Sequence, residues 1–77
     1  MNIFEQVKAT IEAAIPDATA RVSGGGGHFE IEVTSAAFAG KRILEKQRMV
    51  LSAIAPLMAG DAAPVHAVDR LVCNTPS

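Results

Sequence analysis

Apolar residues recur along the first fifteen positions at the spacing of one helical face. They fall three and four residues apart, at Ile3, Phe4, Val7, Ile11, Ala14 and Ile15. Asn2 suits the N-cap, because its side chain can accept a hydrogen bond from a free N–H of the first turn. Pro16 cannot continue a helix and disfavours the helical conformation of the residue before it. The pattern therefore predicts a helix from Asn2 to about Ile15, ended by a turn at Pro16-Asp17.

Two extended segments follow, joined by glycines. Ala18 to Val22 is a short β-prone stretch, and the run from Gly24 to Gly27 after Ser23 predicts a flexible hairpin loop, because four glycines lose the most entropy on ordering. Beyond the loop, apolar and polar residues alternate: Phe29, Ile31 and Val33 against His28, Glu30, Glu32 and Thr34. A period of two predicts a half-buried strand with His28 on its polar face.

A second helix and a third strand complete the pattern. Ser35 to Gly40 breaks the alternation, and a helical period returns from Lys41 with Ile43, Leu44, Val50, Leu51, Ile54, Leu57 and Met58. We expect this helix to end by about Ala59, with a kink or a separate final turn at Pro56. After a linker from Asp61 to Pro64, the residues from Val65 to Cys73 predict a strand with His66 at its entrance.

The order of predicted elements is α-β-β-α-β, an α+β fold. A short loop favours antiparallel pairing of the first two strands, and the intervening helix allows a crossover that makes the second and third strands parallel. Both helices then cover one face of a mixed three-stranded sheet. A chain of 77 residues has room for one small core, so we expect a single domain over residues 1–77.

Composition and charge narrow the function classes. With 49% hydrophobic and 19% charged residues the chain should fold, and its net charge of -1 argues against affinity that comes mainly from phosphate neutralisation. The chain has one cysteine and no signal-peptide pattern, which indicates a cytoplasmic protein. It also lacks an apolar run of about 18 residues, so we expect a soluble protein without a membrane partner. No nucleophile, base and orienting residue stand in a recognisable pattern, so we do not expect an enzyme or a small-molecule substrate.

Four features in a fixed order resemble the BolA-like family. They are the pair His28-Phe29, the stretch Val33, Ser35, Phe38, Gly40 and Lys41, a basic helix segment, and the pair His66-Ala67. Thr75-Pro76 is also similar to the family's ending, although it falls about one residue late relative to His66, which predicts a bulge or a different register in the third strand. Among the branches, the sequence looks most similar to the bacterial IbaG-like group.

The resemblance implies a KH-like fold and two roles. The first is association with a monothiol glutaredoxin through a shared [2Fe-2S] cluster completed by glutathione, in iron–sulfur trafficking or in iron, redox or stress regulation. The second, for some members, is DNA-binding transcriptional regulation. In cluster-binding relatives the loop before the second strand often carries a Cys or His ligand, where this chain has Gly24 to Gly27. The frequent Arg-His-Arg of the second helix is replaced by Lys46-Gln47-Arg48.

His66 is the first candidate ligand. From the residues alone it is an accessible imidazole at a strand entrance, a position where a hydrogen bond to a neighbouring carbonyl is the commoner role. The resemblance implies the cluster-ligand role. His28 is the obvious substitute for the missing loop ligand, because parallel strands would bring the two histidines to one edge of the sheet. Two imidazoles on one iron would resemble Rieske-type ligation.

A basic segment and a lone thiol are the other candidates. Lys41, Arg42, Lys46 and Arg48 are four cations within eight residues, and the first three avoid the apolar stripe. They predict a basic surface that would bind DNA weakly and with strong salt dependence, or meet an acidic glutaredoxin surface; a solvated face balanced by Glu45 is the alternative. Cys73 suits an inert, buried thiol and is left out of the site.

Overall fold

The computed structural model describes residues 2–60 and 63–76, and its element order is the predicted one with a short 3-10 helix added. The elements are α1 (Ile3–Ala14), β1 (Thr19–Gly25), β2 (His28–Thr34), η1 (Ala36–Phe38), α2 (Ile43–Met58) and β3 (Ala67–Asn74). Asp61 and Ala62 of the predicted linker lie outside the described residues. None of the helices in the described residues is long and apolar enough to cross a bilayer.

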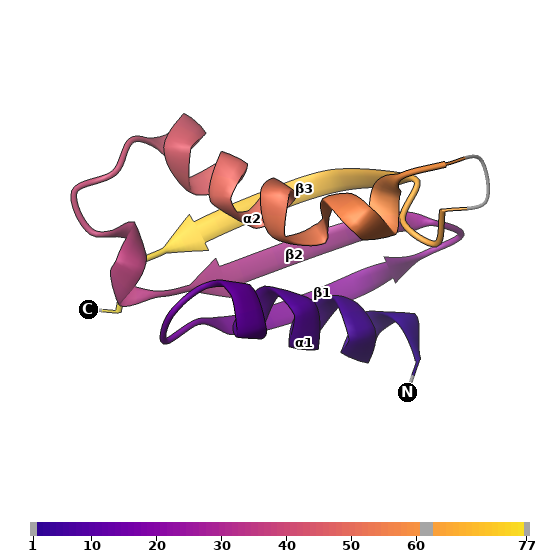
Figure 1. Cartoon of the computed structure of the whole chain (residues 1–77), viewed down its shortest axis with the longest axis horizontal. Helices are drawn as coiled ribbons and strands as arrows, with labels where there is room; N and C mark the ends of the chain where they lie inside the picture. Colours follow the sequence, from indigo (N-terminus) through magenta and orange to yellow (C-terminus); the bar gives the residue numbers. More distant parts are fainter. Residues whose placement is uncertain (1, 61–62, 77) are drawn as a thin grey trace.

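The three strands form one mixed sheet in the order β1-β2-β3, as predicted (Figure 1). β1 pairs with β2 in the antiparallel sense, and β2 pairs with β3 in the parallel sense. His28 is opposite Ala67 and Phe29 is opposite Val68, but Glu30 is opposite Arg70, so Asp69 is an extra residue in β3. Of the two alternatives that the late Thr75-Pro76 predicted, a bulge or a different register, this irregularity agrees with the bulge.

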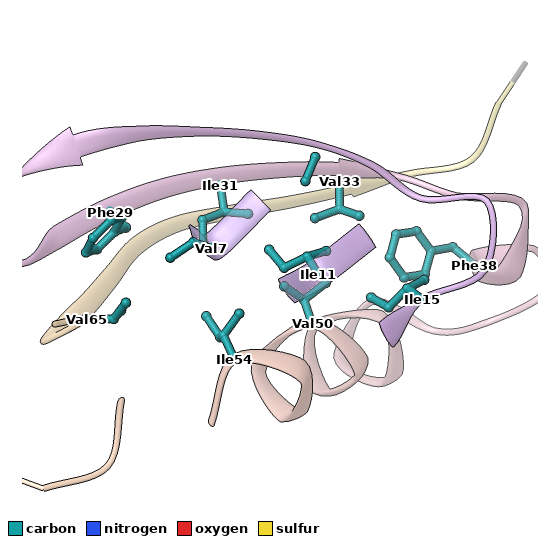
Figure 2. Packing of buried hydrophobic residues seen from close by; sticks show 11 residues of the cluster. Val7, Ile11, Ile15, Phe29, Ile31, Val33, Phe38, Val50, Ile54 and Val65 are labelled. Carbon is teal, nitrogen blue, oxygen red and sulfur yellow. The ribbon is translucent and has the colours of Figure 1, made fainter. Parts of the chain in front are cut away.

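Both helices cover the same face of the sheet (Figure 1). Side chains from β2 and from the two helices meet in one layer (Figure 2), and the cluster consists of Val7, Ile11, Ile15, Ala20, Phe29, Ile31, Val33, Phe38, Val50, Ile54 and Val65. The alternation of β2 holds, because Phe29, Ile31 and Val33 are buried while His28 and Glu30 are exposed. The opposite face of the sheet is therefore polar and carries His28.

α1 forms where the pattern predicts it. The Asn2 side chain accepts a hydrogen bond from the Glu5 N–H at 2.9 Å, and the Ile15 N–H closes the last turn on the Ile11 carbonyl. Val7 and Ile11 are its buried residues, whereas Ala14, which we placed on the apolar face, is exposed. The last turn leaves Ala14 on the solvent side of the helix.

The glycine run forms less loop than predicted. β1 extends through Gly24 and Gly25, and only Gly26 and Gly27 form the turn, with φ of +61° and +82°. Two positive φ values in a two-residue loop are typical of a type I′ turn, whose twist matches that of the paired strands. Gly24 allows the strands to come close, because a Cβ there would lie 2.1 Å from the His28 carbonyl oxygen. The prediction that all four glycines form the loop is therefore wrong, because only two of them form the turn.

α2 begins two residues later than the predicted start at Lys41, and its end agrees with the predicted end by about Ala59. Its first residue is Ile43, with Arg42 as N-cap, and Pro56 lies inside one continuous helix that ends at Met58, so the separate final turn is wrong. The buried residues of α2 are Val50 and Ile54. Ile43 and Leu44 are 73% and 55% exposed, although the apolar pattern includes them. The first turn of α2 therefore lies beyond the core.

Two polar contacts connect segments that are distant in the sequence. The hydroxyl of Ser35, which is fully buried, donates to the Pro16 carbonyl at 2.6 Å and accepts from the Ala37 N–H at 3.0 Å. The Glu12 carboxylate accepts from the Ala20 N–H at 2.9 Å and pairs with the Lys8 ammonium. The first contact fixes the start of η1 and the second attaches β1 to α1.

Candidate functional site

His66 lies immediately before β3, at the end of the sheet where the β1–β2 hairpin turns. It is exposed, and its backbone N–H donates to the Gly27 carbonyl at 2.8 Å. The Ala67 N–H donates to the same carbonyl oxygen at 3.1 Å. Val65 is buried, and its N–H bonds to the Leu57 carbonyl near the end of α2. The hairpin on one side and α2 on the other thus fix the backbone that presents the imidazole.

The His66 ring packs directly on Gly27. A Cβ built on Gly27 would lie 2.3 Å from the ring carbon Cδ2 and 3.0 Å from Cγ, closer than real Cβ contacts. The positive φ of Gly27 also disfavours any residue with a side chain. Position 27 therefore requires glycine for two reasons: the turn needs a positive φ, and the His66 ring occupies the space of a side chain. The sequence marked it only as one of four loop glycines.

His28 is the first residue of β2 and is also exposed. Its Nδ1 lies 3.2 Å from Oδ1 of Asp69, the extra residue of the bulge. In the neutral ring this contact places the proton on Nδ1, because a carboxylate can only accept, and leaves the lone pair on Nε2. Sequence reasoning did not identify Asp69 as a partner of His28, although the late Thr75-Pro76 was a signal of the bulge that positions it.

The two candidate histidines come from neighbouring backbones. Ala67, not His66, is the register partner of His28, so the two rings start from adjacent but unpaired positions. In residues 2–60 and 63–76, no three His, Cys, Asp or Glu side chains gather as a metal site. The prediction that His28 and His66 lie at one end of the sheet is confirmed for their backbones. Ligation of a metal by either side chain stays a prediction.

The prediction that Lys41, Arg42 and Lys46 avoid the apolar stripe is wrong for Lys46, and Arg48, which was not placed off the stripe, is exposed. Lys41, Arg42 and Arg48 are exposed, but Lys46 is half-buried. Lys46 faces the side of α2 that approaches β3, where its charge acts on the Cys73 thiol. Cys73 is itself half-buried, and desolvation by burial raises its pKa although Lys46 opposes that effect. A raised pKa keeps the thiol protonated, which agrees with the inert role that we predicted.

Comparison with known proteins decides the family. The profile of the BolA-like protein family matches residues 4–77. The chain belongs to the BolA-like family. It is 38% identical over 76 residues to the Protein BOLA2 of Arabidopsis thaliana, a match that covers 94% of this chain and 77% of that protein. The KH-like order of elements that the resemblance implied is thus the fold of a BolA-like protein.

Solved structures of BolA-like proteins share this fold. A bolA protein homologue from Coxiella burnetii superposes with a TM-score of 0.81 at 30% identity, covering 99% of this chain and 94% of that one. The solution structure of BolA1 from Mus musculus gives a TM-score of 0.74 at 30% identity, covering 99% and 67%. The assignment of this BolA-like chain to the IbaG-like branch stays a prediction.

Proposed function

We propose that this BolA-like protein is an adaptor that binds a monothiol glutaredoxin through a shared [2Fe-2S] cluster, with His66 as its main ligand. The family consists generally of regulatory or adaptor proteins rather than enzymes. The observation that carries the proposal is the presentation of His66. Its ring is exposed, while its backbone is fixed by the Gly27 carbonyl and the ring is seated on the Gly27 backbone.

The donor chemistry of this end of the sheet fits such a cluster. Imidazole nitrogen is an established iron ligand, and histidine ligation replaces cysteine on one iron in Rieske centres. A carboxylate that holds the non-ligating nitrogen of a metal-bound histidine is a recurrent supporting contact, and Asp69 is placed to do this for His28. His66 is the first ligand of the proposal and His28 the second. The partner's thiolate and glutathione supply the others.

Fixing His66 before the partner arrives favours binding. A ligand side chain that is ordered only on binding costs about 0.5–1.5 kcal/mol of entropy. Here the backbone of residues 66 and 67 is already hydrogen-bonded to the turn, and the ring already contacts Gly27. The cost that remains is the restriction of an exposed imidazole. We therefore assign to the glycine turn the role of supporting the ligand.

The test is a spectroscopic titration of the chain with its host's monothiol glutaredoxin, glutathione, iron and sulfide. We expect the visible absorption and circular dichroism of the glutaredoxin cluster to change when the chain is added. His66→Ala should abolish the change, and His28→Ala should reduce it. Far-ultraviolet circular dichroism of both variants checks that they are folded, as expected for exposed side chains. A folded His66→Ala variant that gives the parent spectrum would overturn the ligand assignment.

A further inference from the structure

Three large apolar side chains of α2 are exposed to solvent. Ile43, Leu44 and Leu51 are 73%, 55% and 38% exposed. Leu44 and Leu51 are seven residues apart, which places them on one stripe of the helix about 10 Å apart, with Arg48 between them. Apolar residues at this spacing are the anchors that another helix or apolar segment contacts.

Exposed cations surround these apolar residues. Lys41, Arg42 and Arg48 are exposed, and no carboxylate in the described part of the chain pairs with any of them. The nearby Glu45 carboxylate instead accepts from the Arg42 backbone N–H at 3.4 Å. Residues 41–48 hold four cations and one anion, a net +3, in a chain whose total is -1, so the rest of the chain carries -4. The positive charge is therefore concentrated at the start of α2.

Neither feature stabilises the chain by itself. The N-terminus of a helix is the positive end of its dipole, so cations at its first turn are unfavourable by a few tenths of a kcal/mol each. Ile43 and Leu44 leave most of their apolar surface in water and so add little to the hydrophobic stabilisation of the fold. Residues that break local rules without a gain in the folded chain are expected at functional surfaces.

We propose that Ile43, Leu44, Leu51, Lys41, Arg42 and Arg48, named here the basic–apolar patch, bind an acidic protein segment that carries apolar side chains at helical spacing. Charge complementarity selects the acidic partner. The exposed Ile43 and Leu44 favour a protein over DNA, because phosphate contacts come from cations and polar groups and leave such side chains without a partner. This function is separate from cluster binding and does not depend on it.

The N-terminal part of the basic–apolar patch, from Lys41 to Leu44, lies far from His66. Leu57, whose carbonyl bonds to Val65, is fourteen residues after Ile43, which corresponds to about 21 Å along α2. In Figure 1 the start of α2 and the segment that leads into β3 are at opposite ends of the helix. The cations and the apolar residues at the start of α2 are therefore remote from the end of the sheet that carries His66.

The test uses a synthetic peptide of about 18 residues, five helical turns, with Leu along one face, Glu flanking it, and Ala and Gln elsewhere. Backbone amide NMR of the folded chain should show shifts confined to residues 41–52, with His28 and His66 unaffected. One control peptide replaces Leu by Gln at constant charge, and another replaces Glu by Lys. Neither control should bind. Equal binding of the Gln peptide, or no shifts at the patch, would overturn the proposal.

Variants of the chain provide the second arm. Leu44→Gln should weaken peptide binding about tenfold, as expected for loss of one partly buried leucine. The double variant Lys41→Gln/Arg42→Gln should weaken it severalfold and reduce its salt dependence. Arg70→Gln is the matched control, an exposed arginine on the open sheet face that should bind like the parent. A short DNA duplex that binds more tightly than the peptide, with no effect of Leu44→Gln, would show a nucleic-acid surface instead and refute the proposal.

Discussion

Replacing Gly27 by alanine tests how the hairpin turn supports His66. Gly26 and Gly27 both have positive φ, so an alanine at either position adopts a left-handed backbone. They differ in what the new methyl group would meet. At Gly26 nothing lies within 4 Å, whereas at Gly27 the methyl group would lie 2.3 Å from the His66 ring. Gly26→Ala is therefore the matched control, because the contact with His66 is what separates the two variants.

The expected magnitudes follow from these contacts. A left-handed L-residue costs about 1–2 kcal/mol, and the restricted unfolded chain returns about 0.4–1 kcal/mol of this. Gly26→Ala should therefore lower the free energy of unfolding by about 1 kcal/mol. Gly27→Ala must in addition displace the His66 ring, at about 0.5–1.5 kcal/mol, or weaken two backbone hydrogen bonds, at about 1 kcal/mol each. The total cost of Gly27→Ala is then about 1.5–3 kcal/mol.

The assay is urea and thermal unfolding followed by far-ultraviolet circular dichroism, together with NMR of the histidine ring protons. For a domain of this size, each kcal/mol corresponds to roughly 4–8 °C in Tm. Gly27→Ala should melt below Gly26→Ala and should shift the His66 ring signals, while Gly26→Ala leaves them in place. Equal stabilities, with the His66 signals unmoved in both variants, would refute the argument that Gly27 supports the ring.

Two further changes probe the fold that carries the site. Ser35→Ala removes a fully buried hydroxyl together with its hydrogen bonds to the Pro16 carbonyl and the Ala37 N–H, so it should cost about 1–3 kcal/mol in urea unfolding. Ser52→Ala, at an exposed helical site, should change stability by less than about 0.5 kcal/mol. The hydrogen bond from Lys8, with that from the Ala20 N–H, holds the pKa of Glu12 below its usual value. Ionised Glu12 thus stabilises the fold above its unfolded pKa, and this contribution is lost as pH falls through the folded pKa. Glu12→Gln should therefore destabilise the chain at pH 7, and the difference from the parent should shrink in unfolding curves as the pH is lowered below 4.5; a difference independent of pH would contradict this.

The elements were predictable because each depends on a local period. The i, i+3, i+4 spacing predicted α1, and the alternation from His28 to Thr34 predicted β2 and the polar face that carries His28. The exposed start of α2 was not predictable, because Ile43 and Leu44 satisfy the helical period but extend beyond the core. Periodicity indicates which face is apolar and does not indicate where the covering sheet ends.

The details of the candidate site depend on contacts between distant segments. The contact between the His66 ring and Gly27 joins the hairpin turn to the start of β3. The residues next to Gly27 and His66 in the sequence do not indicate this contact. The pairing of His28 with Asp69 depends on a single extra residue in β3. Only the one-residue offset of Thr75-Pro76 pointed to that bulge. Half-burial of Lys46 likewise follows from how α2 packs beside β3.

The most direct test of the central claim is to detect the nitrogen of His66 on the cluster. The chain is labelled with 15N-histidine, combined with unlabelled glutaredoxin, glutathione, iron and sulfide, and reduced to make the cluster paramagnetic. Pulsed electron paramagnetic resonance should then show 15N coupling from the labelled chain, and His66→Gln should remove the stronger part of it, while His28→Gln should leave the His66 coupling in place. A 15N coupling that persists unchanged in a folded His66→Gln variant, or no 15N coupling in the parent complex, would contradict the assignment of His66 as ligand.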